Sequence, residues 1–388
     1  MELSDLRRRP DVSAPGLEAS DAADRLILDE ARPFVDALVA DLGATAAGAR
    51  VAVIGDTHGA LALGTAAAHG LRGIRVHQDA LLGERAIAEN ARRVGFADAV
   101  RVLPAEAALV EGARVVLLRL PRSLDALDEV AALIAEYADD DVVVVAGGRL
   151  KHMSPAMNHV LLRHFGRVDV SHARQKSRVL VVREPHPAGM GAITGPDAAW
   201  PRRAHDDELD IDIVSHGGAF AGTSVDIGTR FLIAELPVAI GGERPERAID
   251  LACGTGVVAV ALARLLPAAQ VEAYDQSAVA VRSARETAEA NGVADRIRVE
   301  RADALELVGD GIADLVVLNP PFHAGGALTT ALAERLFADA GRALRPGGRL
   351  VTVWNSHLRY RQALQRLVGP TRQIARNPKF TVTVSTRL

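Results

Sequence analysis

The chain is poor in cysteine, lysine and aromatic residues, and the shortage of cysteine excludes two kinds of structural feature. Cys253 is the only cysteine of the 388 residues, so the chain can form no internal disulfide and no metal site built on cysteines, which favours a reducing cytoplasm. No apolar run is long enough to cross a bilayer. Arg7 to Arg9 are not followed by an apolar stretch, so we expect no secretory signal.

Length and composition indicate two α/β domains. At 388 residues the chain is long for one core, and 49% of its residues are hydrophobic while aromatics make up only 3%. The net charge of −4 argues against a uniformly basic nucleic-acid-binding protein.

A strand followed by an unusual tetrapeptide is the most informative local pattern. The apolar run 313–318 is typical of a buried strand in a parallel sheet, and it is followed by Asn319, Pro320, Pro321 and Phe322. Because prolines donate no N–H and hold the backbone extended, the Asn319 side-chain oxygen and the Pro320 carbonyl become fixed acceptors. They suit an amino group with two hydrogens, and Phe322 offers a flat face to its ring. An ordinary proline-rich loop is the alternative.

A glycine turn upstream predicts a site for a nucleotide-like ligand. Residues 248–252 are expected as a strand and 257–266 as a helix, with Gly254 and Gly256 in the turn between them. Asp275 ends the next predicted strand about 20 residues beyond the turn, where a carboxylate can bind a ribose diol.

The order of these features resembles the class I S-adenosylmethionine-dependent methyltransferases, in the branch that modifies amino groups. The resemblance implies S-adenosylmethionine as the cofactor. Its expected binding residues are Asp250, Gly254, Gly256, Asp275 and Asp303, and the expected catalytic residues are Asn319, Pro320 and Phe322. Helix capping is an alternative role for Asp275 and Asp303 and is compatible with ligand binding.

An internal repeat predicts that the first half is a duplicate of the second. Residues 74–102 align with 271–299 without a gap, and the match includes polar positions. Gln78 stands where the second half has Asp275, so the first half lacks cofactor-binding residues. We therefore expect two tandem class I methyltransferase domains, Rossmann-like and doubly wound, of which the first is degenerate. The strand periodicity common to any two doubly wound domains is the plainer alternative.

Composition shifts suggest the domain boundaries. Residues 1–18 are expected as a mobile tail, 19–184 as the degenerate domain and 185–204 as a linker rich in proline and glycine. The catalytic domain is expected to span 205–388, entered by an edge strand at 206–213.

A segment before the glycine turn sharpens the family resemblance. Asp226 and Thr229 begin a predicted helix, and with the degenerate first half and the motif extended by His323 they resemble the bacterial ribosomal RNA guanine-N2 methyltransferases of the small- and large-subunit pair. The resemblance places Asp226 and Thr229 at the methionine end of the cofactor; a capped connecting helix is the alternative. Ala252 stands where the family more usually has glycine, so we expect a slightly shifted turn.

Charge in the last fifty residues points to an RNA partner. After Asp339 the sequence has no acidic residue, and a segment of one sign can hold phosphates beside the site. The expected substrate-binding residues are His323, Arg361, Arg372 and Lys379. A second basic cluster lies at 163–178, and arginine-rich codon usage is the alternative for both.

These observations predict methyl transfer to the N2 amine of a guanine in ribosomal RNA, free or in a ribosomal subunit, by a monomer that needs neither a metal nor a membrane. The tetrapeptide leaves open a DNA adenine-N6 or a protein glutamine methyltransferase. A non-catalytic RNA-binding assembly protein is the third alternative.

Overall fold

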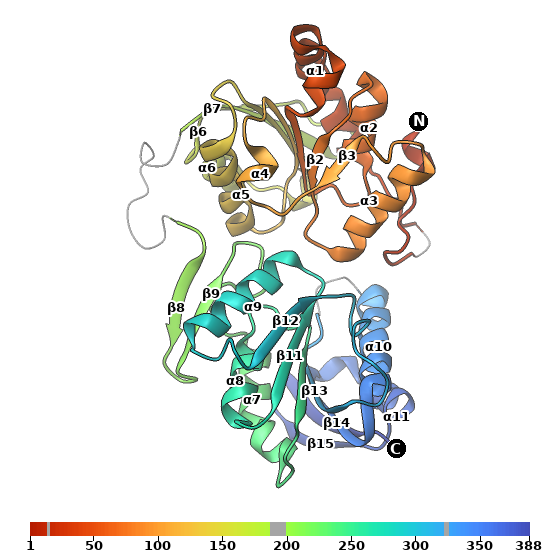
Figure 1. The fold of residues 1–388 in the computed structure, drawn as a ribbon, viewed down its shortest axis with the longest axis vertical. Coiled ribbons are helices and arrows are strands. Elements are labelled where there is room, and N and C mark those ends of the chain that lie inside the picture. The colour runs from red at the N-terminus through yellow and green to blue at the C-terminus, as the bar shows by residue number, and fades with distance from the viewer. Residues whose placement is uncertain (14–15, 187–198, 322–325) are drawn as a thin grey trace. The chain divides into compact units, whose positions relative to one another are not determined.

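The computed structural model describes residues 1–13, 16–186, 199–321 and 326–388, except the side chains of 326–329. The chain divides into two units, Met1–Trp200 and Pro201–Leu388, and each contains a seven-stranded sheet (Figure 1). Phe322 and His323 lie outside the described residues.

The first unit has the strand order β3-β2-β1-β4-β5-β7-β6, in which only β7 runs antiparallel to its neighbours. Its strands are β1 (Val51–Ile54), β2 (Ile74–His77), β3 (Val100–Val102), β4 (Val115–Arg119), β5 (Val143–Arg149), β6 (Phe165–Val170) and β7 (Ser177–Pro185). Its helices are α1 (Ala22–Gly48), α2 (Ala60–His69), α3 (Leu81–Arg93), α4 (Ala107–Val110), α5 (Leu124–Tyr137) and α6 (Pro155–Leu161).

The second unit repeats this order as β12-β11-β10-β13-β14-β16-β15, preceded by the separate hairpin β8–β9. Its strands are β8 (Arg202–Asp206), β9 (Ile211–Ser215), β10 (Arg247–Leu251), β11 (Gln270–Asp275), β12 (Ile297–Arg301), β13 (Ala313–Leu318), β14 (Leu344–Asn355), β15 (Thr371–Arg376) and β16 (Phe380–Thr386). Its helices are α7 (Ile227–Ile240), α8 (Val257–Leu265), α9 (Ala278–Ala290), α10 (Gly326–Ala343) and α11 (Arg361–Leu367). The identical strand order confirms the predicted fold class of two tandem doubly wound domains.

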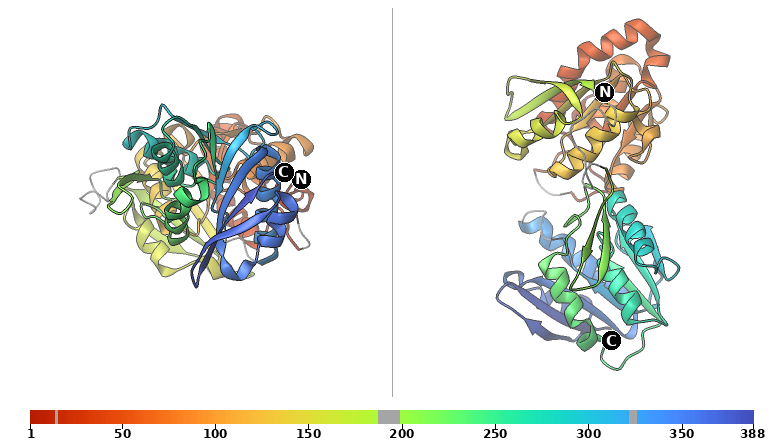
Figure 2. Two further views of the ribbon diagram at one scale, coloured as in Figure 1. Left: turned by 90° about the horizontal axis from the view of Figure 1, so that it is seen from below. Right: turned by 90° about the vertical axis from the view of Figure 1, so that its left-hand side faces the viewer.

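Helices cover both faces of each sheet (Figure 1 and Figure 2). In the second unit, Ile249 packs with α10 and α11, whereas Ala248 packs with α7, α8 and α9. This alternation follows from the strand geometry, because successive side chains point to opposite faces. The strands are apolar throughout because both faces are buried, which explains why they read as continuous apolar runs.

Two expectations about boundaries need correction. The expected mobile tail packs against the first unit, since Leu6 is 6% exposed and the Arg7 amide donates to Asn90 Oδ1 at 3.0 Å. The expected edge strand 206–213 contains the turn between β8 and β9, which pair with each other in a two-stranded sheet. The polar residues before Ile211 form that turn, and Asp210 in it has a φ of +54°.

Candidate functional site

The glycine turn joins β10 to α8 at the carboxyl edge of the second sheet. Gly256 precedes α8 with a φ of +81°, and a Cβ atom there would lie 2.9 Å from the Cβ of Ala284 on α9. Glycine is therefore required at 256 for both conformation and space. Gly254 has a φ of +54°, and a Cβ there would meet no atom within 4 Å, so the turn is open at this point.

Ala252 takes a left-handed conformation at the start of the same turn. Its φ is +60°, in the region where side chains other than glycine are strained. The position where the family more usually has glycine is therefore left-handed in this chain as well, although alanine carries a methyl group there.

Asp250 lies beneath the turn, 2% exposed. Its Oδ2 accepts a hydrogen bond from the Ala259 amide at 3.0 Å, in the first turn of α8. Burial, together with the nearby Asp275 carboxylate, raises the pKa of Asp250 to about 8 against the lowering effect of the Ala259 amide. The structure thus gives this predicted cofactor residue a supporting contact to the helix.

Asp275 connects the end of β11 to the glycine turn. Its Oδ2 accepts from the Gly254 amide at 3.0 Å and its Oδ1 accepts from the Ser277 amide at 2.9 Å. Each carboxylate oxygen can accept more than one hydrogen bond, so this acid can also accept from a ligand diol. Ser277 caps α9, so the capping role considered for Asp275 belongs to its neighbour, whose hydroxyl accepts from the Ala280 amide at 3.1 Å.

Asp303 has a partner that the sequence did not indicate. Its carboxylate forms an ion pair and hydrogen bond with Arg335 of α10, and its amide donates to Glu306 Oε1 at 3.0 Å. The contact spans 32 positions of sequence, so no local pattern could reveal it.

Asn319 follows β13, beside the end of β10. The Nδ2 of Asn319 donates to Thr229 Oγ1 at 2.9 Å. Its Oδ1 is buried and accepts no hydrogen bond within the described part of the chain. Thr352 of β14 donates its hydroxyl to the Leu318 carbonyl at 2.8 Å and holds the preceding backbone. Pro320 is buried next to it.

Thr229 and Asp226 lie at the start of α7. Asp226 accepts hydrogen bonds from the amides of Gly228 at 2.8 Å and Thr229 at 3.3 Å. The structure therefore shows Asp226 as the cap of its own helix and Thr229 as a partner of Asn319.

The C-terminal cations fall into two groups. The first group forms ion pairs with carboxylates: Arg342, Arg345, Arg349 and Arg366. The second group forms no ion pair among the described residues: Arg359, Arg361, Arg372, Arg376, Lys379 and Arg387. Arg361 and Arg372, both predicted to bind substrate, are exposed members of the second group. In the first unit's basic cluster at 163–178, Arg163, Arg167 and Arg174 are ion-paired, whereas Lys176 and Arg178 form no ion pair among the described residues.

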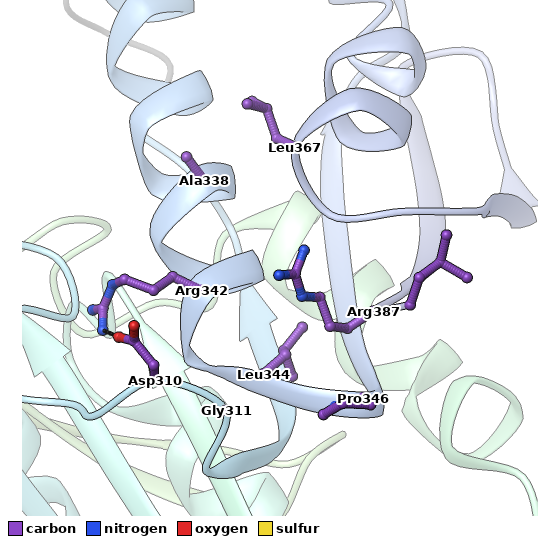
Figure 3. A pocket seen from close by; sticks show the side chains of 9 residues that line it. Asp310, Gly311, Ala338, Arg342, Leu344, Pro346, Leu367 and Arg387 are labelled. Atoms are coloured by element: carbon purple, nitrogen blue, oxygen red, sulfur yellow. Dashed lines mark hydrogen bonds and ion pairs between the residues drawn. The ribbon is translucent and has the colours of Figure 1, made fainter.

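A pocket of about 480 Å³ lies at the opposite edge of the second sheet (Figure 3). Leu344 and Pro346 line it at the start of β14, whereas the glycine turn and Asn319 lie at the carboxyl edge. Arg342 in its wall is already paired with Asp310 at 2.6 Å. This pocket is therefore separate from the candidate site.

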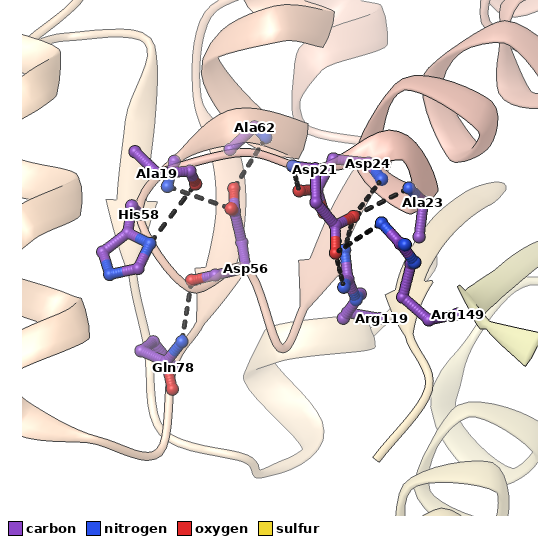
Figure 4. Close-up of polar contacts among 11 residues, drawn as sticks. Ala19, Asp21, Ala23, Asp24, Asp56, His58, Ala62, Gln78, Arg119 and Arg149 are labelled. Carbon is purple, nitrogen blue, oxygen red and sulfur yellow. Dashed lines mark hydrogen bonds and ion pairs between the residues drawn. The ribbon is translucent and has the colours of Figure 1, made fainter. Parts of the chain in front are cut away.

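At the matching edge of the first unit, side chains hydrogen-bond to one another and to nearby backbone (Figure 4). Asp56 lies in the turn after β1, and its Oδ2 accepts from the Ala62 amide at 2.8 Å. Gln78 donates Nε2 to the Asp56 carbonyl at 2.8 Å. Arg119 replaces Asn319 and is bound by Asp21, the cap of α1, and by Asp24 in its first turn. These contacts agree with the predicted loss of a cofactor site in this half.

No helix within the described ranges is long and apolar enough to cross a membrane. Nor does the described part of the chain contain a group of three or more His, Cys, Asp or Glu side chains that could hold a metal ion.

Two family descriptions match the chain, one for each unit. "RLMG N-terminal domain" matches residues 2–186, and "Methyltransferase small domain" matches residues 210–384. Among solved structures, the T. thermophilus 16S rRNA N2 methyltransferase RsmC, in complex with AdoMet and guanosine, is similar in fold. It has a TM-score of 0.74 and 20% identity, with 97% of each chain covered.

Curated relatives match at higher identity over nearly the whole length. Ribosomal RNA large subunit methyltransferase G of Pseudomonas paraeruginosa is 35% identical over 380 residues, 97% of this chain and 96% of the relative. The protein of the same name from Streptomyces avermitilis is 36% identical over 392 residues, 97% of this chain and 95% of the relative. The resemblance drawn from the sequence is thereby confirmed: the chain belongs to the family of the ribosomal RNA large subunit methyltransferases G.

Proposed function

We propose that this protein transfers the methyl group of S-adenosylmethionine to the exocyclic N2 amine of a guanine in ribosomal RNA. The observation that carries the proposal is the Oδ1 of Asn319, a buried acceptor without a donor among the described residues, at the end of β13. A buried oxygen without a hydrogen bond costs about 1–3 kcal/mol, and this one lies at the carboxyl edge of the sheet beside the glycine turn, where a ligand can satisfy it. An incoming amine would supply the missing hydrogen.

The cofactor fits the carboxyl edge of the second sheet. Gly254 leaves the turn open, and Asp275 offers a carboxylate held by two backbone amides. Asp275 would bind the ribose hydroxyls, and Gly254 and Gly256 would allow the backbone to approach the ligand closely. Asp250 would support the turn from below, and Asp303 would lie at the same edge. When bound, S-adenosylmethionine supplies an electrophilic methyl group on a sulfonium.

The chain's task in the reaction is to hold and orient a weak nucleophile. The lone pair of a guanine amine is delocalised into the ring, so the amine needs two acceptors to fix its hydrogens and direct its lone pair. Asn319 Oδ1 and the Pro320 carbonyl supply these acceptors, and Phe322 stacks on the flipped base. His323 orients the base or contacts phosphate. The extra proton of the methylated amine passes to water.

The unpaired cations support an RNA substrate. Arg361, Arg372 and Lys379 would contact phosphates, since their side chains are not neutralised by carboxylates of the described residues. The relatives are named for ribosomal RNA of the large subunit, which supports ribosomal RNA over DNA or protein. We propose that the protein acts in the cytoplasm as a monomer.

Methyl transfer to separated substrates tests the proposal. The purified protein is incubated with labelled S-adenosylmethionine and with naked ribosomal RNA, assembled subunits, DNA or protein from a strain lacking this gene. We expect label in ribosomal RNA, and digestion should yield N2-methylguanosine. Label only in DNA or protein, or in a different nucleoside, would reject the proposal. No transfer to any substrate, with cofactor bound, would favour a non-catalytic RNA-binding protein.

A further inference from the structure

We infer that Thr229 is a positioning residue that holds the Asn319 carboxamide in place. The inference rests on the proposed role of Asn319 in accepting an amine hydrogen. Thr229 Oγ1 receives the Asn319 Nδ2 hydrogen at 2.9 Å, so the donor end of the amide is held against α7. The acceptor end is then the one left for a substrate.

Orientation matters because the two ends of a carboxamide have opposite hydrogen-bonding character. Oδ1 can accept a hydrogen from an amine, whereas Nδ2 can only donate. If the amide turned over, two donors would face each other and the amine would lose its acceptor. The Thr229 hydroxyl itself both donates and accepts, so its contribution is to hold the carboxamide in place, and the arrangement in the structure, with Nδ2 on Thr229, leaves Oδ1 for the amine before any substrate arrives.

The start of α7 is itself firmly held. Asp226 accepts from the Thr229 amide, and Gly228 packs so closely on Phe380 that a Cβ at 228 would lie 3.1 Å from the ring. Phe380 is 4% exposed and belongs to β16. The hydroxyl of Thr229 is thus fixed in place by the capped helix and by the sheet.

The first unit contains the same contact in another chemical form. Asp24 is the third residue after the cap Asp21 of α1, just as Thr229 is the third residue after the cap Asp226 of α7. Asp24 binds Arg119, which ends β4 and aligns in sequence with Asn319. Both units therefore use this helix position to hold the residue at the end of that strand.

The inference predicts an effect on the rate and little effect on binding. Thr229→Val preserves the shape of the side chain but removes the acceptor, so kcat should fall by about 10- to 100-fold, the scale of a misplaced reacting group. Thr229→Ser retains the hydroxyl and should restore most of the rate. The dissociation constant of RNA should change by less than about threefold in both variants.

A double-mutant cycle separates positioning from a general structural role. If Thr229 acts through Asn319, the double variant Thr229→Val, Asn319→Ala should be no slower than Asn319→Ala alone. Multiplied losses in the double variant would overturn the inference, as would a Thr229→Val enzyme with wild-type kcat.

A measurement on the cofactor-free protein gives a readout independent of catalysis. The side-chain amide signals of Asn319 in a nitrogen-15 spectrum can be assigned by their loss in Asn319→Ala. They should shift in Thr229→Val and return in Thr229→Ser; unchanged signals in Thr229→Val would overturn the inference. If the wild type fails to methylate guanine in ribosomal RNA, the proposed function falls, while this amide test still decides whether Thr229 holds Asn319.

Discussion

Arg119 at the end of β4 forms an ion pair with Asp24 in the first turn of α1. This pair occupies the place where the second unit has the neutral contact between Thr229 and Asn319. A guanidinium has donors only, so it cannot accept the hydrogens of an amine. The first unit therefore has the same doubly wound scaffold without the acceptor that we propose for the reaction.

We predict one S-adenosylmethionine site per chain, in the second unit. In the first unit, Gln78 stands at the place of Asp275 and binds the Asp56 carbonyl, and it carries no charge to hold a ribose diol. Titration calorimetry should give a stoichiometry of one. Two equivalent sites per chain would contradict the view of the first unit as a duplicate without a cofactor site.

Asn319→Ala should separate chemistry from binding. It removes one of two acceptors that act mainly as the amine attacks, so the transfer rate should fall by about 10²-fold or more while cofactor and RNA affinities change little. Single-turnover kinetics and equilibrium binding measure the two effects. A fully active variant would show that the proposed role of Asn319 is wrong.

The double change Arg361→Ala, Arg372→Ala should mainly weaken RNA binding. Loss of two phosphate contacts should reduce the slope of log affinity against log salt by up to about two units. The matched control is Arg345→Ala, Arg366→Ala. It removes the same total charge as the first double variant, but from arginines that are already paired with Asp314 and Glu334. An equal loss of affinity in both double variants would argue for net charge alone.

Asp250 should make stability depend on pH. Its pKa is about 8 in the folded chain because of burial, against about 3.9 for an unfolded aspartate. Between these values the folded state holds a proton that the unfolded state releases, so this contribution is complete below about pH 4 and declines toward pH 8, by up to about 1.4 kcal/mol per pH unit.

Denaturant unfolding at several pH values tests this prediction. Asp250→Asn keeps an oxygen for the Ala259 amide and has no proton to release, so its stability should fall less between pH 5 and 8. Asp207→Asn, at an exposed carboxylate, is the matched control. Parallel pH profiles for Asp250→Asn and the wild type would contradict the expectation.

Ala252→Gly should stabilise the second unit. The left-handed conformation of Ala252 costs about 1–2 kcal/mol, and the greater flexibility of glycine when unfolded offsets part of the gain, leaving about 0.5–1 kcal/mol. The same substitution at Ala261, inside α8, should instead destabilise by about 1 kcal/mol. A loss of stability at both positions would show that the methyl group of Ala252 packs more favourably than its backbone strain costs.

The sequence predicted the parts of the site that depend on local order. The strand before Asn319, the glycine turn and the acid ending β11 all lie where the pattern placed them, because parallel strands bring their carboxyl ends to one edge. The repeat likewise predicted the fold of the first unit, and α3 and α9 both have 13 residues.

The contacts that depend on distant partners could not be predicted in this way. Whether Asp303 is free or bound depends on where Arg335 of α10 comes to lie, and the division of the C-terminal arginines depends on which carboxylates face them. The expected tail packs because Leu3 and Leu6 find apolar partners on the first unit. Composition alone shows that the tail is rich in polar residues, but it does not show the apolar surface on which Leu3 and Leu6 pack.

Cys253 is the only thiol of the chain, and it lies inside the glycine turn. The side chain is 8% exposed, and burial raises the pKa of the thiol well above its ordinary value. A thiol reagent reacts with the thiolate, so its reaction rate reflects how often the turn opens to solvent. Because no other thiol competes, a reactivity assay on the unmodified protein monitors the opening of this one loop.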